Sequence, residues 1–248
     1  MILARIVGED QRETLGLATA ELNEQCGELV ARGVTARSAA FTSADRGSEL
    51  VRLAAEQDVA LLLVDAPLGA LRDELPRGEL GTVLADAPCD VALLAARVGS
   101  LPAGPVLVPF GAAHHDWAAL ELGAWLARAH GAPLQLLGSL SGETRDASRL
   151  LADASLIVQR TAGVSAEPLL AEPGPDALLA AANNACLLVV GLSERWQREG
   201  LGATRLTIAE ESVAPVLLVR RGPRPGGLAP AESRTRFTWS LAGAGSQK

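Results

Sequence analysis

Short apolar runs alternate along the chain with longer stretches in which apolar and polar residues are mixed. The runs are apolar at consecutive positions rather than at every second position, and this pattern is typical of strands in a parallel sheet that is covered on both faces. The clear predicted strands cover residues 2–7, 60–64, 91–95, 105–110, 133–137, 187–190 and 215–219, and weaker ones cover 36–42 and 166–171.

The stretches between these runs predict helices. The most regular covers residues 116–130, where the apolar positions have the spacing of a half-buried helix. Asp116 is a suitable N-cap for this helix, and Gly131 is a suitable residue to end it. Because strands and helices alternate, the sequence predicts an α/β fold made of right-handed β-α-β crossovers.

The sequence also contains an internal repeat. A helix followed by a buried strand occurs twice, as ELVRLAAEQDVALLLVDAP from Glu49 and as DALLAAANNACLLVVGL from Asp176. A glycine-rich loop, a short helix, a turn and a last strand also occur twice, as GELGTVLADAPCDVALLAARVG from Gly78 and as EGLGATRLTIAEESVAPVLLVRRG from Glu199. We therefore predict two tandem units at residues 1–98 and 105–222, with a linker at 99–104 and a tail at 223–248.

The two predicted units are unequal. The second has five strands, whereas the first has four, and its first strand leads into a long helix near residues 13–32. This strand therefore matches the second strand of the other unit, so the first unit lacks an opening strand and helix. Either the unit is natively short, or the chain begins part-way into a longer protein. We favour the second alternative, because a missing central strand leaves sheet edges and apolar helix faces bare.

Composition and charge narrow the classes of function. The chain has 248 residues, of which 48% are hydrophobic, and its net charge of −7 offers no basic surface for nucleic acid. The three cysteines, Cys26, Cys89 and Cys186, lie in apolar contexts without metal-ligand spacing, so no metal site is expected. No signal peptide is visible, and no apolar run approaches the roughly 18 residues of a membrane span. We expect a cytoplasmic chain.

Several of these segments resemble the universal stress protein family. The resemblance rests on VLVPF at 106–110, on ALELGAWLARAHGAPLQLL from Ala119, and on the closing VGL, GLGATRL and APVLLVRR, and it extends in part to residues 1–98. It implies a parallel sheet with helices on both faces in each unit. In that family an Asp after the first strand reads adenine, and a G-x2-G-x9-G-[ST] loop binds phosphates.

Neither unit carries that nucleotide motif in full. In the second unit Gly111 stands where the family has Asp, and Gly191 and Gly202 are kept, while Glu194 and Ala203 replace a glycine and the hydroxyl residue. In the first unit Gly81 and Thr82 match the last pair of the motif, and Asp65 occupies the leading glycine. The missing motif residues therefore argue against simple ATP binding.

The tail suggests a more particular resemblance. The incomplete first unit, SERWQREGLGATRL from Ser193 and RPGGLAPAESRTRFTWSL from Arg224 are together similar to the cytoplasmic C-terminal region of bacterial cation:proton antiporters. This resemblance implies an upstream membrane transport domain, a position on the cytosolic face of an inner membrane, and a homodimer. Within the tail, Phe237 and Trp239 either anchor a docked arm or belong to a disordered end. We favour the docked arm.

In a doubly wound sheet, ligands bind at the carboxyl ends of the strands. Three loops of the second unit meet there: residues 111–116, residues 138–142 and residues 191–205. Glycines allow close approach of a phosphate, arginines bind it in a forked geometry, and a tryptophan can stack on a base. The candidate nucleotide-binding residues are Pro109, Phe110, Gly111, His114, Gly138, Gly191, Leu192, Ser193, Arg195, Trp196, Arg198, Gly200, Gly202, Thr204 and Arg205.

Each candidate has an alternative interpretation. Trp196 can pack a hydrophobic patch, and the neighbouring arginines can pair with Glu194 and Glu199. His114 and His115 either sense pH or simply precede a helix, and the second case is the commoner one. No nucleophile elbow or catalytic triad is present, so we do not expect an enzyme.

The sequence therefore favours a cytosolic regulatory domain of a cation:proton antiporter that senses an adenine-type nucleotide. Paired arginines and a tryptophan suit cyclic di-AMP, a compact ligand with two phosphodiesters that a dimer can share. The competing interpretation is a free-standing tandem universal stress protein that acts as an ATP-binding or ligand-free interaction scaffold. A third is a nucleotide hydrolase.

Overall fold

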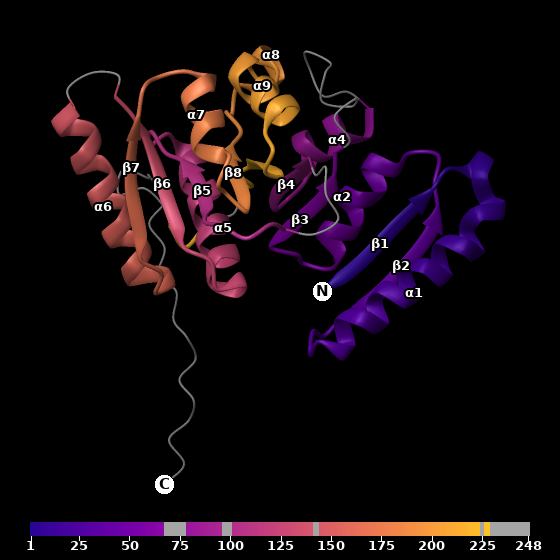
Figure 1. Ribbon diagram of the computed structural model, residues 1–248. Coiled ribbons are helices and arrows are strands. Elements are labelled where there is room, and N and C mark those ends of the chain that lie inside the picture. Colours follow the sequence, from indigo (N-terminus) through magenta and orange to yellow (C-terminus); the bar gives the residue numbers. More distant parts are fainter. Residues whose placement is uncertain (67–77, 96–100, 141–143, 224–225, 229–248) are drawn as a thin grey trace, which may run out of the picture.

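A computed structural model describes residues 1–66, 78–95, 101–140, 144–223 and 226–228 of the chain (Figure 1). The strands are β1 (Ile2–Val7), β2 (Arg37–Thr42), β3 (Leu61–Asp65), β4 (Asp90–Ala95), β5 (Val106–Pro109), β6 (Leu134–Ser139), β7 (Ala166–Ala171), β8 (Leu187–Gly191) and β9 (Val216–Arg220). The helices are η1 (Glu9–Thr14), α1 (Leu15–Ala31), α2 (Arg46–Glu56), α4 (Gly78–Asp86), α5 (His114–His130), α6 (Thr144–Ala162), α7 (Pro175–Ala182), α8 (Trp196–Glu199) and α9 (Ala203–Glu211).

The strands form two sheets. Seven of them lie in one sheet in the order β3-β4-β9-β8-β5-β6-β7, and β1 and β2 form a separate parallel pair. Every pairing is parallel except that of β4 with β9. The α/β fold in two tandem units is confirmed, and each of the nine predicted strands exists with its ends shifted by at most two residues.

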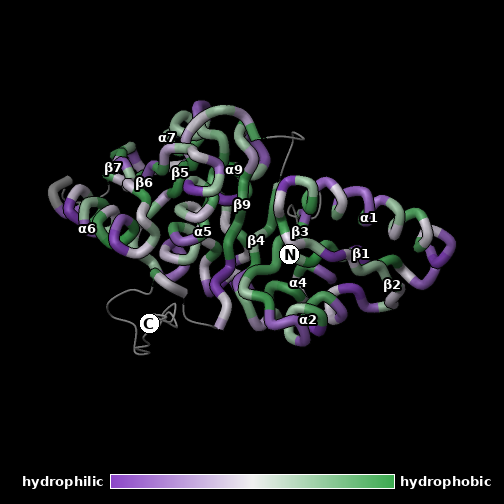
Figure 2. Tube along the Cα trace, turned by 90° about the horizontal axis from the view of Figure 1, so that it is seen from below, coloured by the Kyte–Doolittle hydropathy of each residue, from purple (hydrophilic) through white to green (hydrophobic). Residues whose placement is uncertain are grey.

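The antiparallel ladder between β4 and β9 joins the two units, and the sequence did not indicate it. Each of these strands is the last of its unit, and Leu93 lies opposite Leu218 at the centre of the ladder. Figure 2 shows the apolar strands β3, β4 and β9 side by side at the junction. The units therefore share one sheet instead of having one sheet each.

Helices cover both faces of the large sheet. Buried side chains of α5 and α6 pack in one apolar cluster, with Trp117, Leu120 and Leu151 among them. Those of α4, α7 and α9 pack in a second cluster, which includes Leu84, Leu178 and Ile208. Helices α5 and α9 thus lie against opposite faces, as the continuous apolar strands predicted.

The first unit is split where the second unit has its central strand. In the second unit β5 lies between β6 and β8, and it is followed by α5. Within the described part of residues 1–95 no strand or helix corresponds to β5 and α5. The predicted absence of an opening strand and helix is therefore confirmed, and it leaves β1 and β2 outside the large sheet (Figure 1).

Helix α5 begins two residues earlier than predicted. Ala113 is its N-cap, and Asp116 lies at the third position of its first turn, so the N-cap position predicted for Asp116 is wrong. The carboxylate instead accepts hydrogen bonds from the backbone N–H groups of Gly111 and Ala113, at 2.9 and 3.0 Å. Gly131 ends the helix with φ of 67°, as predicted, because glycine adopts the left-handed conformation without strain.

A buried arginine forms hydrogen bonds between the two units. Arg220, at the end of β9, donates hydrogen bonds to the carbonyl oxygens of Leu84, Ala87 and Cys89, at 2.7, 3.1 and 3.2 Å. Two of these carbonyls lie at or just beyond the C-terminus of α4, where carbonyls have no partner within the helix. Burial lowers the pKa of the Arg220 guanidinium. A single side chain of the second unit thus caps a helix of the first.

The described start of the tail is docked. Leu228 is buried in the cluster beneath α5, and the carboxylate of Glu121 accepts hydrogen bonds from the backbone N–H groups of Gly227 and Leu228, at 2.9 and 3.2 Å. Phe237 and Trp239, the predicted anchors, lie outside the described residues. None of the helices in the described ranges is long and apolar enough to cross a membrane.

Candidate functional site

The carboxyl ends of β5 and β8 form the switch point of the second unit. The two strands are neighbours in the sheet, and the chain leaves them toward α5 on one face and toward α9 on the other. Connections that diverge in this way open a crevice at the carboxyl edge, where doubly wound folds bind their ligands. The loops 110–113 and 192–202 lie at this edge, within two of the three predicted segments, 111–116 and 191–205. The third predicted loop, 138–142, lies in part outside the described residues.

Arg205 connects the two loops. Its Nε donates a hydrogen bond to the carbonyl oxygen of Gly191, at 2.7 Å, and its Nη2 lies 3.2 Å from Nε2 of His115. The same Nε2 lies 3.4 Å from Oδ1 of Asp116. An arginine has no acceptor, so a hydrogen bond from Arg205 requires an unprotonated Nε2 on His115. A third bond runs to the carbonyl oxygen of Leu201, at 3.4 Å. The guanidinium therefore links the end of β8 to the start of α5.

Gly191 is required by a close approach of the two backbones. A Cβ atom at this position would lie 2.6 Å from the carbonyl oxygen of His115 and 2.9 Å from its ring. No side chain fits without moving the start of α5. The kept glycine of the sequence motif therefore serves contact between β8 and α5 in this conformation, and His115 fills the space beside it.

Burial sets the protonation of this cluster. It lowers the pKa of His115 from 6.5, and this effect exceeds the attraction of the neighbouring Asp116. It also lowers the pKa of Arg205. Because burial disfavours the charged imidazole, acidification acts against the buried arrangement of His115.

The side chains at the outer rim of the site are exposed, and several of them form pairs with one another. His114 Nδ1 lies 2.7 Å from Glu194 Oε1, and Arg221 donates a hydrogen bond to the carbonyl oxygen of His114, at 3.4 Å. Arg195 and Glu199 form an ion pair at 3.7 Å, as the alternative interpretation of these arginines expected. Arg198 and Thr204 are exposed, and they are available to a ligand on the same rim.

Four of the predicted site residues are positioned for packing. Trp196 and Leu192 are buried in the cluster beneath α9, and Phe110 packs edge-to-face on Trp117 with ring centroids 4.9 Å apart. Gly138 belongs to β6, where a Cβ atom would lie 2.9 Å from Leu151. Trp196 is only 7% exposed, which favours the packing interpretation of this residue over stacking on a base.

The remaining predicted residues lie on the edge itself. Pro109 ends β5, and Gly111 follows it with its N–H held by Asp116. The Ser193 hydroxyl accepts a hydrogen bond from the Arg195 N–H, at 3.2 Å. Gly200 and Gly202, with φ of 65° and 80°, form the turn that leads into α9. Contact of these residues with a nucleotide stays a prediction.

A cavity beside this edge lies between the two units. It has a volume of about 570 Å³ and is lined by Glu194 and Trp196, by the turn 84–88, and by Arg220 and Arg221. Sequence reasoning missed the arginine pair and the turn, because it considered each unit alone. The available signal was the charged pair that ends an otherwise apolar strand, VLLVRR. Within the described ranges, no group of three or more His, Cys, Asp or Glu residues could hold a metal ion.

Comparisons with known proteins define the fold. No protein-family model and no curated protein matches the chain. A universal stress protein from Archaeoglobus fulgidus DSM 4304 superposes with a TM-score of 0.61, is 16% identical, and aligns over 89% of this chain and 86% of its own. A putative universal stress protein from Pseudomonas aeruginosa UCBPP-PA14 superposes with a TM-score of 0.58, is 17% identical, and aligns over 88% of this chain and 82% of its own. The chain thus has the fold of universal stress proteins.

A third solved structure has the same arrangement. It is a functionally unknown protein from Pseudomonas aeruginosa PAO1, which is 19% identical, with a TM-score of 0.54 and coverage of 88% of this chain and 82% of its own. The three neighbours each align with most of both tandem units, so the fold they share with this chain includes the pair.

The lowered pKa of His115 predicts a pH dependence of stability. The unfolded chain takes up a proton near pH 6.5, whereas the folded chain resists it. The contribution of this residue is therefore complete above that pH, and it is lost as the pH falls. We expect His115→Asn to reduce the fall in urea-unfolding midpoint between about pH 7 and pH 5. His130→Asn, at the exposed end of α5, is the control. If the urea-unfolding midpoint fell with pH equally in both variants, the role given to His115 would be contradicted.

Proposed function

We propose that the second unit binds an anionic adenine-type nucleotide at the carboxyl edge of β5 and β8, and that the chain acts as a regulatory module and not as an enzyme. The observation that carries the proposal is the switch point itself, where Gly191, Arg205 and the turn at Gly200 and Gly202 lie together. Exposed Arg198 and Thr204 add donors on the rim, in a chain whose net charge is −7.

The contacts of Arg205 with Gly191 and His115 suggest how a ligand would change the conformation. The Arg205 guanidinium is bound to Gly191 and His115 in the described conformation. A phosphate that took over Arg205 would compete with these bonds, so it would favour a second conformation of the loop and of α9. A ligand shifts such an equilibrium only by the difference between its affinities for the two states. Cyclic di-AMP is a candidate, since its two phosphodiesters would suit Arg198 and Arg205 and could be shared by a homodimer.

Calorimetric titration with ATP, cyclic AMP and cyclic di-AMP tests this proposal. We expect one of the three to bind, and we expect Arg205→Gln to weaken it by about tenfold or more, because a charged hydrogen bond contributes roughly 1.5–3 kcal/mol. Arg198→Gln tests the rim without disturbing packed side chains. Arg160→Gln, exposed on α6, is the control. Absence of heat with all three ligands would leave the interaction scaffold as the better account.

We further propose that the regulated activity is cation:proton antiport, with the module on the cytosolic face of a membrane. The support is the resemblance of the incomplete first unit and of the segments at 193–206 and 224–241 to antiporter C-terminal regions. In cells that express the native gene, we expect the polypeptide to fractionate with membranes and to yield peptides from apolar segments upstream of Met1. A native N-terminus at Met1 in the soluble fraction would contradict this proposal.

A further inference from the structure

The edges of β1 and β3 that face away from β2 and β4 are without a strand in the described part of the chain. The order of chain elements makes β1 the counterpart of β6 and β3 the counterpart of β8. In the second unit β5 lies between β6 and β8 and is paired with both. The two free edges of the first unit are therefore the two edges that would hold a strand equivalent to β5.

The sequence of β3 is that of a central strand, but its environment is that of an edge. All five residues of its counterpart β8 are buried. In β3, which reads LLLVD, none is buried, and Leu63 is 57% exposed. An apolar edge strand with unpaired backbone groups is a surface that pairs with further strands. Burial of Leu63 needs a covering element on the face where α5 covers β8.

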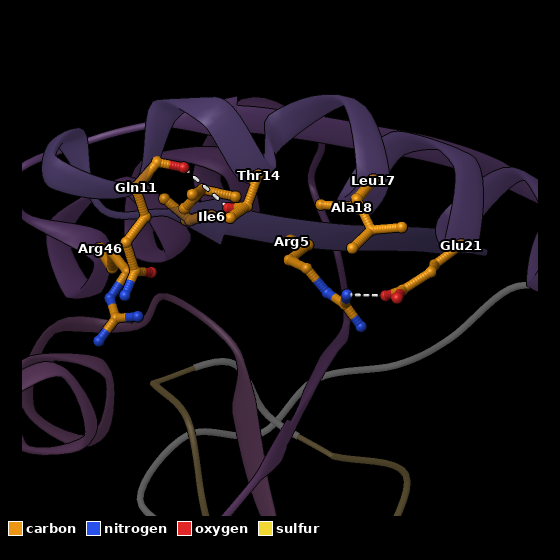
Figure 3. Close-up of a pocket in the computed structure, with 9 residues that line it drawn as sticks. Arg5, Ile6, Gln11, Thr14, Leu17, Ala18, Glu21 and Arg46 are labelled. Carbon is orange, nitrogen blue, oxygen red and sulfur yellow. Dashed lines mark hydrogen bonds and ion pairs between the residues drawn. The ribbon is translucent and has the colours of Figure 1, made fainter.

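The helix that follows β1 has a similar gap. Its counterpart α6 packs against α5, whereas α1 has no such neighbour among the described residues. Leu17 of α1 is 64% exposed. It lines a cavity of about 280 Å³, together with Ala18 and with Arg5 to Val7 of β1 (Figure 3). Arg5 is held by Glu21 at the side of this cavity. An apolar helix face would cover Leu17.

We propose that the edges of β1 and β3 form a docking site for one strand–helix segment of a binding partner. The segment is a strand of about four or five apolar residues that runs parallel to β1, followed by a helix whose apolar face covers Leu17 and Leu63. Backbone hydrogen bonds on both sides of the strand supply affinity, and its apolar side chains supply specificity. The occupied site would join β1 and β2 to the large sheet. This proposal does not depend on nucleotide binding.

The chain itself supplies a probe with this chemistry. A synthetic peptide of residues 104–131 contains the strand β5 and the helix α5, which occupy the equivalent place in the second unit. We expect the peptide to slow hydrogen exchange of amides in both β1 and β3 by about tenfold or more, because exchange of a newly paired amide requires its release. The outer edges of β2 and β7 have no paired strand among the described residues, and they should be unaffected.

Two matched variants make the test specific. Leu63→Arg places a charge on the exposed face of β3 and should abolish the protection, whereas Leu156→Arg, at a position 50% exposed on α6, should preserve it. A peptide with Val108→Asp should not bind. No protection of β1 and β3, equal protection of β2 and β7, or unchanged protection in the Leu63→Arg variant would each overturn the proposal.

Discussion

The antiparallel ladder of β4 and β9 is the interaction on which the arrangement of the whole molecule depends. It places the last strands of both units side by side. Arg220 of the second unit can therefore donate hydrogen bonds to the carbonyl groups at the end of α4 in the first unit. Because these carbonyls are buried, loss of the guanidinium would leave them without partners, at a cost of about 1–3 kcal/mol for each. The ladder also brings the turn 84–88 against the loop after β8, and so creates the cavity between the units.

The same ladder explains how an incomplete unit is held in place. Strand β3 belongs to the large sheet only through β4, and β4 belongs to it through β9. In the described part of the chain, strands β1 and β2 have no strand pairing with the large sheet, and they form a separate pair (Figure 1). The first unit is thus anchored at its carboxyl side and open at the position of the missing strand. At the switch point of the second unit, by contrast, Arg205 connects the end of β8 with His115 of α5.

The strands and the repeat could be predicted from the sequence because they depend on local patterns. Continuous apolar runs predict strands whatever their neighbours are, and the repeat identified the missing strand by comparison within the chain. The ladder between β4 and β9 could not be predicted, since the apolar sequences of two strands carry no information on which of their edges meet. The roles of Trp196 and Phe110 were also beyond the sequence, because an aromatic residue after a strand packs inward or outward according to the helix beside it. Asp116 is a residue type that favours the N-cap position, but here its carboxylate accepts a hydrogen bond from Gly111 in the loop before the helix.

Residue-resolved hydrogen exchange of the free chain under native conditions tests the shared sheet most directly. If the ladder makes one cooperative unit of β3, β4, β8 and β9, the paired amides of β4 will exchange with the same opening free energy as those of β8 and β9, while β1 and β2 will open at lower free energy. An opening in which β4 exchanges with β1 and β2, well before β9, would contradict the account, because the units would then unfold as separate domains.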